Sequence, residues 1–220
     1  MKKFTTSALL IVSLFIFSAC GEIPFSDNSL SELRSDVFFA ENENFSLYAY
    51  AELKETPLAD DGYAGEKSPF LYFKLCLPVG SPATDRKSLR FIIGEEEYEA
   101  FFGYQSVSAF LTCEVPVKSL PEKNFSVTLQ SENQTYDFEL ASLKKINNFD
   151  YQDIALVALN SDIKEVNSLL STAERYEMRI RLLESEGFNY WYVAVISANG
   201  GIALLYDAET AELIATKKLE

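Results

Sequence analysis

Residues 45–53 have the sequence Phe-Ser-Leu-Tyr-Ala-Tyr-Ala-Glu-Leu, and this stretch decides the fold class. Its apolar residues stand at every second position and alternate with Ser, Tyr and Glu. Because successive side chains of a strand point to opposite faces, the alternation predicts a strand with one face in a core. We therefore expect a mostly β protein, and the neighbouring sequence extends that expectation in both directions.

Further apolar or alternating runs follow residue 53 and are separated by short turn signals. Residues 70–79 are apolar on both faces, which is typical of a central strand. Pairs of runs flank the polar segments 94–97 and 131–134 and predict two hairpins. About seven strands at this spacing are typical of an immunoglobulin-like antiparallel sandwich, which we assign to residues 42–145.

The hydrophobic period changes near residue 147. Apolar residues then recur every three or four positions as far as Ser171, which predicts one broken helix or two short ones. Asp150 and Asp162 stand where helix caps are expected. A helix over a three-stranded antiparallel meander makes a small α+β domain, assigned to residues 146–220. The meander strands are expected at 176–183, 190–197 and 202–206.

Two short stretches of this domain resemble a known family. Residues 191–195 are Trp-Tyr-Val-Ala-Val, and residues 207–214 are Asp-Ala-Glu-Thr-Ala-Glu-Leu-Ile. With the preceding helix, they resemble a PepSY-type domain over residues 150–216. The resemblance implies an export-side module of cystatin-like character, of a kind proposed to inhibit or chaperone peptidases. The family usually has Gly where this chain has Ala211, because the turn there needs left-handed backbone.

The N-terminus has the anatomy of an export signal. Two lysines precede an uncharged apolar run, and small residues then lead to Cys20. This stretch resembles the lipobox of bacterial lipoproteins, with Phe17 where Leu is usual. The resemblance implies that residues 1–19 are a signal peptide and that Cys20 carries a lipid such as palmitate. It also implies that the chain is anchored to the extracytoplasmic side of a bacterial membrane.

Two alternatives for the N-terminus are a retained transmembrane helix and a plain signal peptide with an accidental cysteine. A transmembrane helix needs ~20 apolar residues, and the run before Cys20 is shorter than that. Residues 20–41 are polar and interrupted, so we expect them to form the lipidated tether. The tether places the rest of the chain at a membrane surface.

Composition limits the partners and the chemistry. The chain has a formal net charge of −14, which opposes binding to nucleic acid and to anionic lipid. The expected contact with the membrane is therefore the lipid on Cys20. The chain has no histidine, which removes the usual general base, the Ser-His-Asp triad and histidine ligation of metals.

The acidic clusters do not replace that missing chemistry. The acids at 95–97 stand at an expected turn, and the segment 60–62 lacks the alternating acids of a calcium loop. We therefore expect no catalytic residue, no metal and no cofactor.

Two cysteines remain besides Cys20. An even pair in an exported protein predicts one disulfide, between Cys76 and Cys113. Cys113 shares the phase of the core-facing residues around it, whereas Cys76 lies on a mixed face. Two buried free thiols are the alternative, and the pattern leaves both open.

Tyr190 and Tyr192 are the candidate binding residues. They share one face of an expected strand, while Trp191 and Val193 share the other. If the helix covers Trp191, the two tyrosines are exposed, although packing inside the protein is the alternative. We therefore expect a non-catalytic binding or adaptor lipoprotein for an extracellular protein or glycan. The second hypothesis, implied by the PepSY resemblance, is an inhibitor or folding helper of an exported peptidase.

Overall fold

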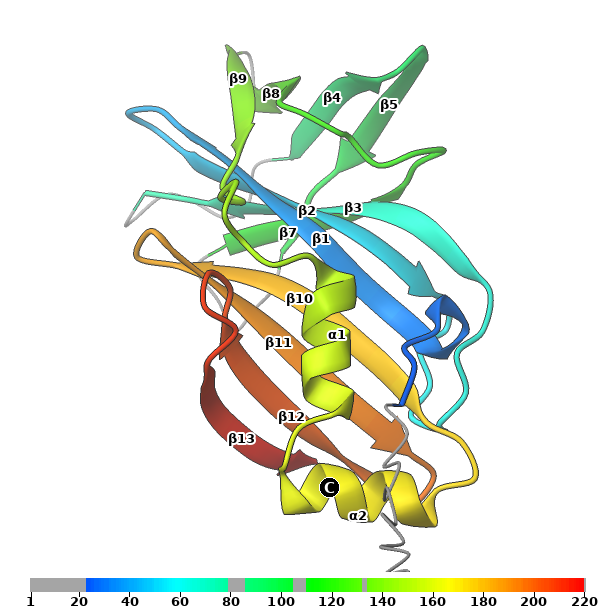
Figure 1. Cartoon of the computed structure of the whole chain (residues 1–220). Helices are drawn as coiled ribbons and strands as arrows, with labels where there is room; N and C mark the ends of the chain where they lie inside the picture. The colour runs from blue at the N-terminus through cyan, green and yellow to red at the C-terminus, as the bar shows by residue number, and fades with distance from the viewer. Residues whose placement is uncertain (1–22, 79–85, 105–109, 132–133, 220) are drawn as a thin grey trace, which may run out of the picture.

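The computed structural model describes residues 23–78, 86–104, 110–131 and 134–219. Strands dominate, as Figure 1 shows, and the prediction of a mostly β protein is confirmed. The expected signal peptide and Cys20 lie outside the described residues. The strands are β1 (Leu30–Glu41), β2 (Ser46–Glu55), β3 (Lys67–Cys76), β4 (Lys87–Ile93), β5 (Glu96–Phe101), β6 (Gly103–Tyr104), β7 (Phe110–Pro116), β8 (Phe125–Ser131), β9 (Gln134–Ser142), β10 (Glu177–Ser185), β11 (Phe188–Ser197), β12 (Gly200–Asp207) and β13 (Leu213–Leu219). The helices are η1 (Asp27–Ser29), α1 (Tyr151–Leu159) and α2 (Lys164–Thr172).

Strand β1 corrects the prediction that residues 20–41 form a tether. It lies in the middle of a long sheet with the order β13-β12-β11-β10-β1-β2-β3-β7-β6. It pairs in parallel with β10 and antiparallel with β2. Irregularities at 30–32 and 34–36 interrupt its pairing. Each irregularity shifts the alternation of side chains, which is why no period of two marks this strand in the sequence.

A second sheet, with the order β9-β8-β4-β5, packs over one half of the long sheet. Strand β9 also pairs with Phe38 and Phe39 of β1, so it joins the two sheets at one side. The first core lies between them and is rich in aromatic contacts. The ring of Phe38 meets that of Phe125 at 5.2 Å, and Phe73 meets Phe91 at 5.1 Å.

Two helices cover the other half of the long sheet. They are the second of the two expected alternatives, two short helices rather than one broken one. Asp150 caps α1, since its carboxylate accepts a hydrogen bond from the backbone N–H of Tyr151 (2.6 Å). The expected cap at Asp162 is wrong, because α2 has Ile163 at its N-cap and no side-chain cap.

The second core lies between these helices and strands β10, β11 and β12. Ile154 of α1 and Val166 of α2 pack against a cluster that contains the fully buried Trp191. Leu30 and Leu33 of β1 belong to the same cluster. The structure adds a fourth antiparallel strand, β13, to the expected three. Its side chains are exposed up to Lys218, so no apolar pattern marks it in the sequence.

Both cores lie on the same face of the long sheet. Ala49 and Ala51 of β2 belong to the first core, and Leu53, two residues further on, packs against the second. Because residues two apart in a strand share a face, the second sheet and the helices together cover one face. We call the opposite face the open face. The division expected near residue 145 thus separates two covering layers but does not divide the sheet.

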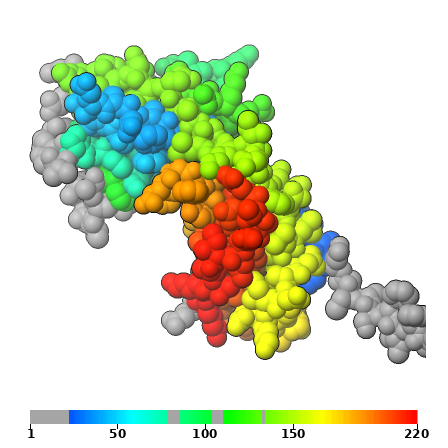
Figure 2. All heavy atoms as spheres, turned by 60° about the vertical axis from the view of Figure 1, so that its left-hand side comes forward, coloured from blue at the N-terminus to red at the C-terminus, as the bar shows by residue number. Residues whose placement is uncertain are grey.

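The molecule bends where the two halves meet. Figure 2 shows it hollowed between the strands of the first half, coloured blue to green, and the orange and red strands of the second half. The segment between β2 and β3 also bridges the halves. Gly62 of this segment packs against the second half, where a Cβ atom would come within 3.2 to 3.3 Å of the backbone of Ser197, Ala198 and Arg175. Its φ of +80° also suits glycine, which has no Cβ.

Candidate functional site: the open face of the long sheet

The structure places Tyr190 and Tyr192 on the open face, where both are half-buried. Trp191 between them points to the second core, and its indole N–H donates to the carbonyl of Phe149 (3.0 Å). The helices therefore cover the Trp191 face, and none of the described helices or strands covers the tyrosine face. The candidate site starts from these two tyrosines and extends across the sheet.

A row of aromatic rings continues the open face over β1, β2 and β3. The rings of Tyr48 and Tyr50 stack with their centroids 6.4 Å apart, and Tyr72 lies 5.9 Å from Tyr50. Phe39 lies 4.7 Å from Tyr48. The sequence marks Tyr48 and Tyr50 as the polar side of an alternating strand, but only strand pairing brings Phe39 and Tyr72 beside them.

Ion pairs cross the same face between neighbouring strands. Two of the carboxylates, on Glu32 and Glu52, are almost completely buried, with 4% and 5% of their side chains exposed. Buried charges need partners and hydrogen bonds, and both acids have them. The contacts are Arg181 to Glu32 (2.6 and 2.5 Å), Arg34 to Glu52 (2.6 and 3.0 Å), Lys54 to Glu52 (3.2 Å) and Lys54 to Glu114 (2.5 Å).

These cations also lie over aromatic rings. A cation above the face of a ring is attracted by the ring's quadrupole. Each of these cations is therefore held by a carboxylate and by a ring, so its position is set before any ligand arrives. The pairs are Arg34 over Tyr50 (4.4 Å), Arg181 over Tyr192 (5.6 Å) and Lys54 over Phe70 (5.2 Å).

Two open hollows flank Arg181 on this face. One, of about 340 Å³, lies over β1 and β2 and is lined by Arg34, Glu52 and Tyr72 among others. The other, of about 410 Å³, extends toward β11 and includes Tyr192. The ion pair between Arg181 and Glu32 forms part of the surface between them. The candidate site is therefore a ridged surface with two shallow depressions rather than a closed pocket.

The loop between β2 and β3 crosses one end of the open face. Arg179 donates to the carbonyl of Ala59 (2.7 Å) and forms an ion pair with Asp60. The carboxylate of Asp60 is 73% exposed, so most of it meets solvent as the sequence suggests. Its partner on β10 shows that the loop is tied to the second half of the molecule.

Beneath this loop lies a fully buried carboxyl group, Glu177. Its Oε1 accepts a hydrogen bond from Arg179 (3.1 Å), and its Oε2 has no hydrogen-bond partner among the described residues. Glu55 lies close enough to interact electrostatically, and its Oε2 accepts from the N–H of Gly65 (2.5 Å). Burial, and to a smaller extent Glu55, raises the pKa of Glu177 to about 7. No pattern in the sequence predicts this group, because its burial depends on the loop.

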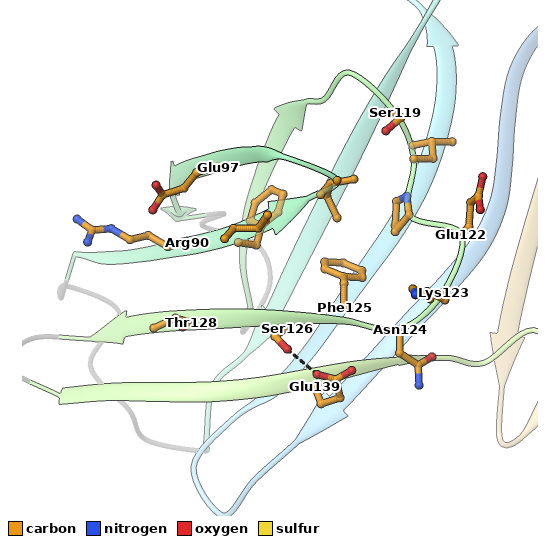
Figure 3. A pocket seen from close by; sticks show the side chains of 16 residues that line it. Arg90, Glu97, Ser119, Glu122, Lys123, Asn124, Phe125, Ser126, Thr128 and Glu139 are labelled. Carbon is orange, nitrogen blue, oxygen red and sulfur yellow. Dashed lines mark hydrogen bonds between the residues drawn. The ribbon is translucent and has the colours of Figure 1, made fainter.

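A more voluminous hollow, of about 970 Å³, lies elsewhere, on the outer side of the second sheet. Figure 3 shows Arg90 and Glu97 on one side of it and Asn124 with Lys123 on another. The hydroxyl of Ser126 donates to Glu139 there (2.6 Å). Arg90 forms an ion pair with Glu99 and is 58% exposed, so its charge stays hydrated. The open face offers charged groups that are more buried, and we take it as the candidate site.

Cys76 and Cys113 are free thiols rather than a disulfide, and both are half-buried rather than buried as that alternative expected. Cys113 packs against the first core and pairs with Phe73 of β3. Cys76 lies three residues after Phe73 on that strand. An odd spacing along a strand puts them on opposite faces, so their sulfur atoms cannot meet. Burial raises the pKa of the Cys113 thiol to about 12.

Within the described ranges, no group of three Cys, Asp or Glu side chains is arranged to hold a metal ion. The helices described there are all too short or too polar to cross a membrane. Comparisons with known protein families, with curated proteins and with solved structures find no match to this chain.

Proposed function

We propose that this protein is a non-catalytic, lipid-anchored binding or adaptor protein on the extracytoplasmic side of a bacterial membrane. Its open face is the proposed binding surface, and an extracellular protein is the proposed partner. The observation that carries the proposal is a sheet face that bears tyrosines and ion-paired arginines and that no described helix or strand covers, although the loop between β2 and β3 crosses one end of it. Tyr and Arg are enriched where protein interfaces gain most of their affinity, and preordered side chains lower the entropy lost on binding.

Contacts on the open face favour a protein over a glycan as partner. Sugar platforms need a free aromatic face, but a cation already lies over one face of Tyr50 and of Tyr192. Alternating charges from Arg181, Glu32 and Arg34 suit a protein surface with complementary charges. The same mixture of signs, in a strongly acidic chain, does not suit nucleic acid.

The strand order supports an immunoglobulin-like sandwich as the first half of the proposed adaptor. The two sheets of that fold have the orders A-B-E-D and C-F-G, with an added strand next to C in the variable type. Here β2-β3-β7-β6 and β5-β4-β8-β9 correspond to A-B-E-D and C′-C-F-G. Strand β1 is then an addition before strand A. Many cell-surface domains share the sandwich architecture, which agrees with the proposed role.

The test is capture of surface and secreted proteins by the mature chain, compared among variants. We expect Tyr192→Ala and Tyr72→Ala each to weaken capture of the same partner by about 30-fold, the effect of losing a hot spot of ~2 kcal/mol. The matched control is Ile92→Ala, because Ile92 is 60% exposed on the other sheet. Capture that Ile92→Ala weakens as much as Tyr192→Ala would reject the open face. Selective binding to a glycan array would reject a protein partner.

The second candidate function is an inhibitor or folding helper of an exported peptidase. The conformation of the motif at residues 207–214 favours it. Ala211 has a φ of +57°, the left-handed conformation for which PepSY-type domains usually have glycine. Asp207 organises the same turn, since its Oδ1 accepts from the N–H groups of Glu209 and Thr210 (2.9 Å each). The turn thus has the backbone that the resemblance implies.

The peptidase hypothesis is tested with the whole mature chain, because the second core includes Leu30 and Leu33 from outside the PepSY-like segment. The chain is added to peptidases secreted by the same cell, and their activity and maturation are measured. A lowered activity that Ile214→Lys on the exposed strand β13 relieves would support inhibition. Unchanged activity and maturation would reject this candidate.

A further inference from the structure

The first described residues are fastened to α1. The backbone N–H of Ile23 donates to the side chain of Asn160 (2.8 Å), and the amide group of Asn160 donates back to the carbonyl of Ile23 (3.2 Å). The ring of Phe25 meets that of Tyr151 edge-on at 6.2 Å. Ile23 and Phe25 both pack against the second core. Ile23 and Phe25 therefore already belong to the packed body of the protein rather than to a tether that ends at residue 41.

This attachment limits how far the body can lie from a lipid on Cys20. Ile23 lies three positions after Cys20, and a fully extended chain spans at most ~11 Å over three residue steps. We propose that the helix corner, formed by residues 156–168 at the junction of α1 and α2, rests on the membrane surface. The inference depends on the proposed lipid anchor at Cys20 and names the surface that this anchor brings to the bilayer.

The side chains of the helix corner suit the interfacial region of a bilayer. Leu156 and Val157 are 41% and 37% exposed on α1, although they are apolar. Leu156 also adjoins the attachment, because its carbonyl accepts a hydrogen bond from Asn160 (3.0 Å). Apolar side chains that enter the interfacial region of a bilayer add to the membrane affinity that an acyl chain supplies. The helix corner has two exposed acids, Asp162 and Glu165, and one exposed base, Lys164. Because basic clusters are what anionic lipids attract, the proposed contact does not depend on anionic lipid.

This placement orients the proposed binding surface. In Figure 1, α2 lies at one end of the molecule, and strands β4, β5, β8 and β9 lie at the other. With the helix corner on the membrane, the second sheet points away from it. The open face then extends outward from the bilayer between these ends, where a protein partner can reach it from the side.

The test measures the distance of single labels from the bilayer. The lipidated protein is made in a host that acylates it, in a background with Cys76→Ser and Cys113→Ala, and is reconstituted in phosphatidylcholine vesicles. A fluorophore is attached at Asp162→Cys in the helix corner or at Glu122→Cys near the second sheet. Both native side chains are exposed, so both labels face solvent in the free protein. The quencher is a lipid with a nitroxide on its headgroup.

We expect quenching at Asp162→Cys to exceed quenching at Glu122→Cys several-fold. Inserting about eight Gly and Ser residues before Ile23 adds a flexible span of roughly 16 Å and should remove most of that difference. Equal quenching at the two sites, with a lipid on Cys20 shown by mass spectrometry, would overturn the proposed orientation. A protein without that lipid would instead reject the anchor on which it rests.

Discussion

Glu177 is a buried carboxyl group whose ionisation is coupled to folding. Its pKa is raised by burial from 4.5 to about 7, beside Arg179, Glu55 and Ser31. The folded state thus holds this proton more tightly than the unfolded state. The resulting stability is fully present below about pH 4.5 and is lost as the pH rises toward 7.

We expect Glu177→Gln to flatten this pH dependence and to raise stability at pH 8. Urea unfolding at a series of pH values measures the effect. The control is Glu97→Gln, which changes an exposed carboxylate and should show the same dependence of stability on pH as the unmodified protein. A Glu177→Gln variant with the unmodified pH profile would show that another group is responsible.

Cys113 offers a second prediction at this scale. Burial raises the pKa of its thiol to about 12, and only the thiolate reacts with alkylating agents. At pH 8 we expect iodoacetamide to modify Cys76, which lies on the open face, at least about tenfold faster than Cys113. Mass spectrometry follows both sites, and urea should abolish the difference. Equal rates in the folded protein would contradict the placement of Cys113.

Ala211 holds a backbone conformation that suits glycine. A left-handed φ costs residues other than glycine about 1–2 kcal/mol. Replacing Ala211 by glycine removes this cost, but about half of the gain is offset because glycine gives the unfolded chain more conformational entropy. We therefore expect Ala211→Gly to stabilise the protein by about 0.5–1 kcal/mol in urea unfolding. Ala215→Gly, on the exposed strand β13, is the control and should destabilise it by a similar amount. A destabilised Ala211→Gly variant would contradict the turn geometry.

At the scale of elements, β1 is the strand on which both cores depend. Leu33 is 7% exposed and pairs with Ile180 on one side and Leu53 on the other. We expect Leu33→Ala to lower the free energy of unfolding by about 2–4 kcal/mol, as large-to-small changes in cores do. Leu58→Ala, in the loop after β2, should change it by less than about 0.5 kcal/mol. Equal, small effects would mean that residues 30–41 behave as a tether.

The elements predicted correctly are those whose burial follows a single period. The burial of strand β2 alternates from Ser46 to Ala51, and α1 has both an apolar stripe and the cap at Asp150. The missed elements lack such a signal. The irregularities of β1 reset its alternation, and the exposed side chains of β13 have no buried face to mark. Both strands exist because their neighbours supply hydrogen bonds, and that is information from distant parts of the chain.

At the scale of the whole molecule, the two halves share one sheet. Strands β1 and β10 pair in parallel, and Arg181 to Glu32 is an ion pair across that junction. We expect residues 23–219 to unfold in a single transition monitored by circular dichroism. A chain of residues 146–219 alone lacks Leu30 and Leu33 and should remain unfolded. As the matched control, residues 23–41 are linked to that fragment, and we expect the linked chain to fold. A cooperative transition in the fragment alone would show that the second half is independent.

Local patterns in the sequence determined the mostly β character, the helical region that follows Asp150 and the placement of Tyr190 and Tyr192 on one strand face opposite Trp191. They did so because hydrophobic periods report which side of an element is buried. Only the tertiary structure decided that the covering layers share one sheet and that Arg181, Glu32 and the tyrosines form one surface. Such neighbours come from strands up to 149 positions apart, and pairing between distant strands depends on register and packing rather than on local sequence.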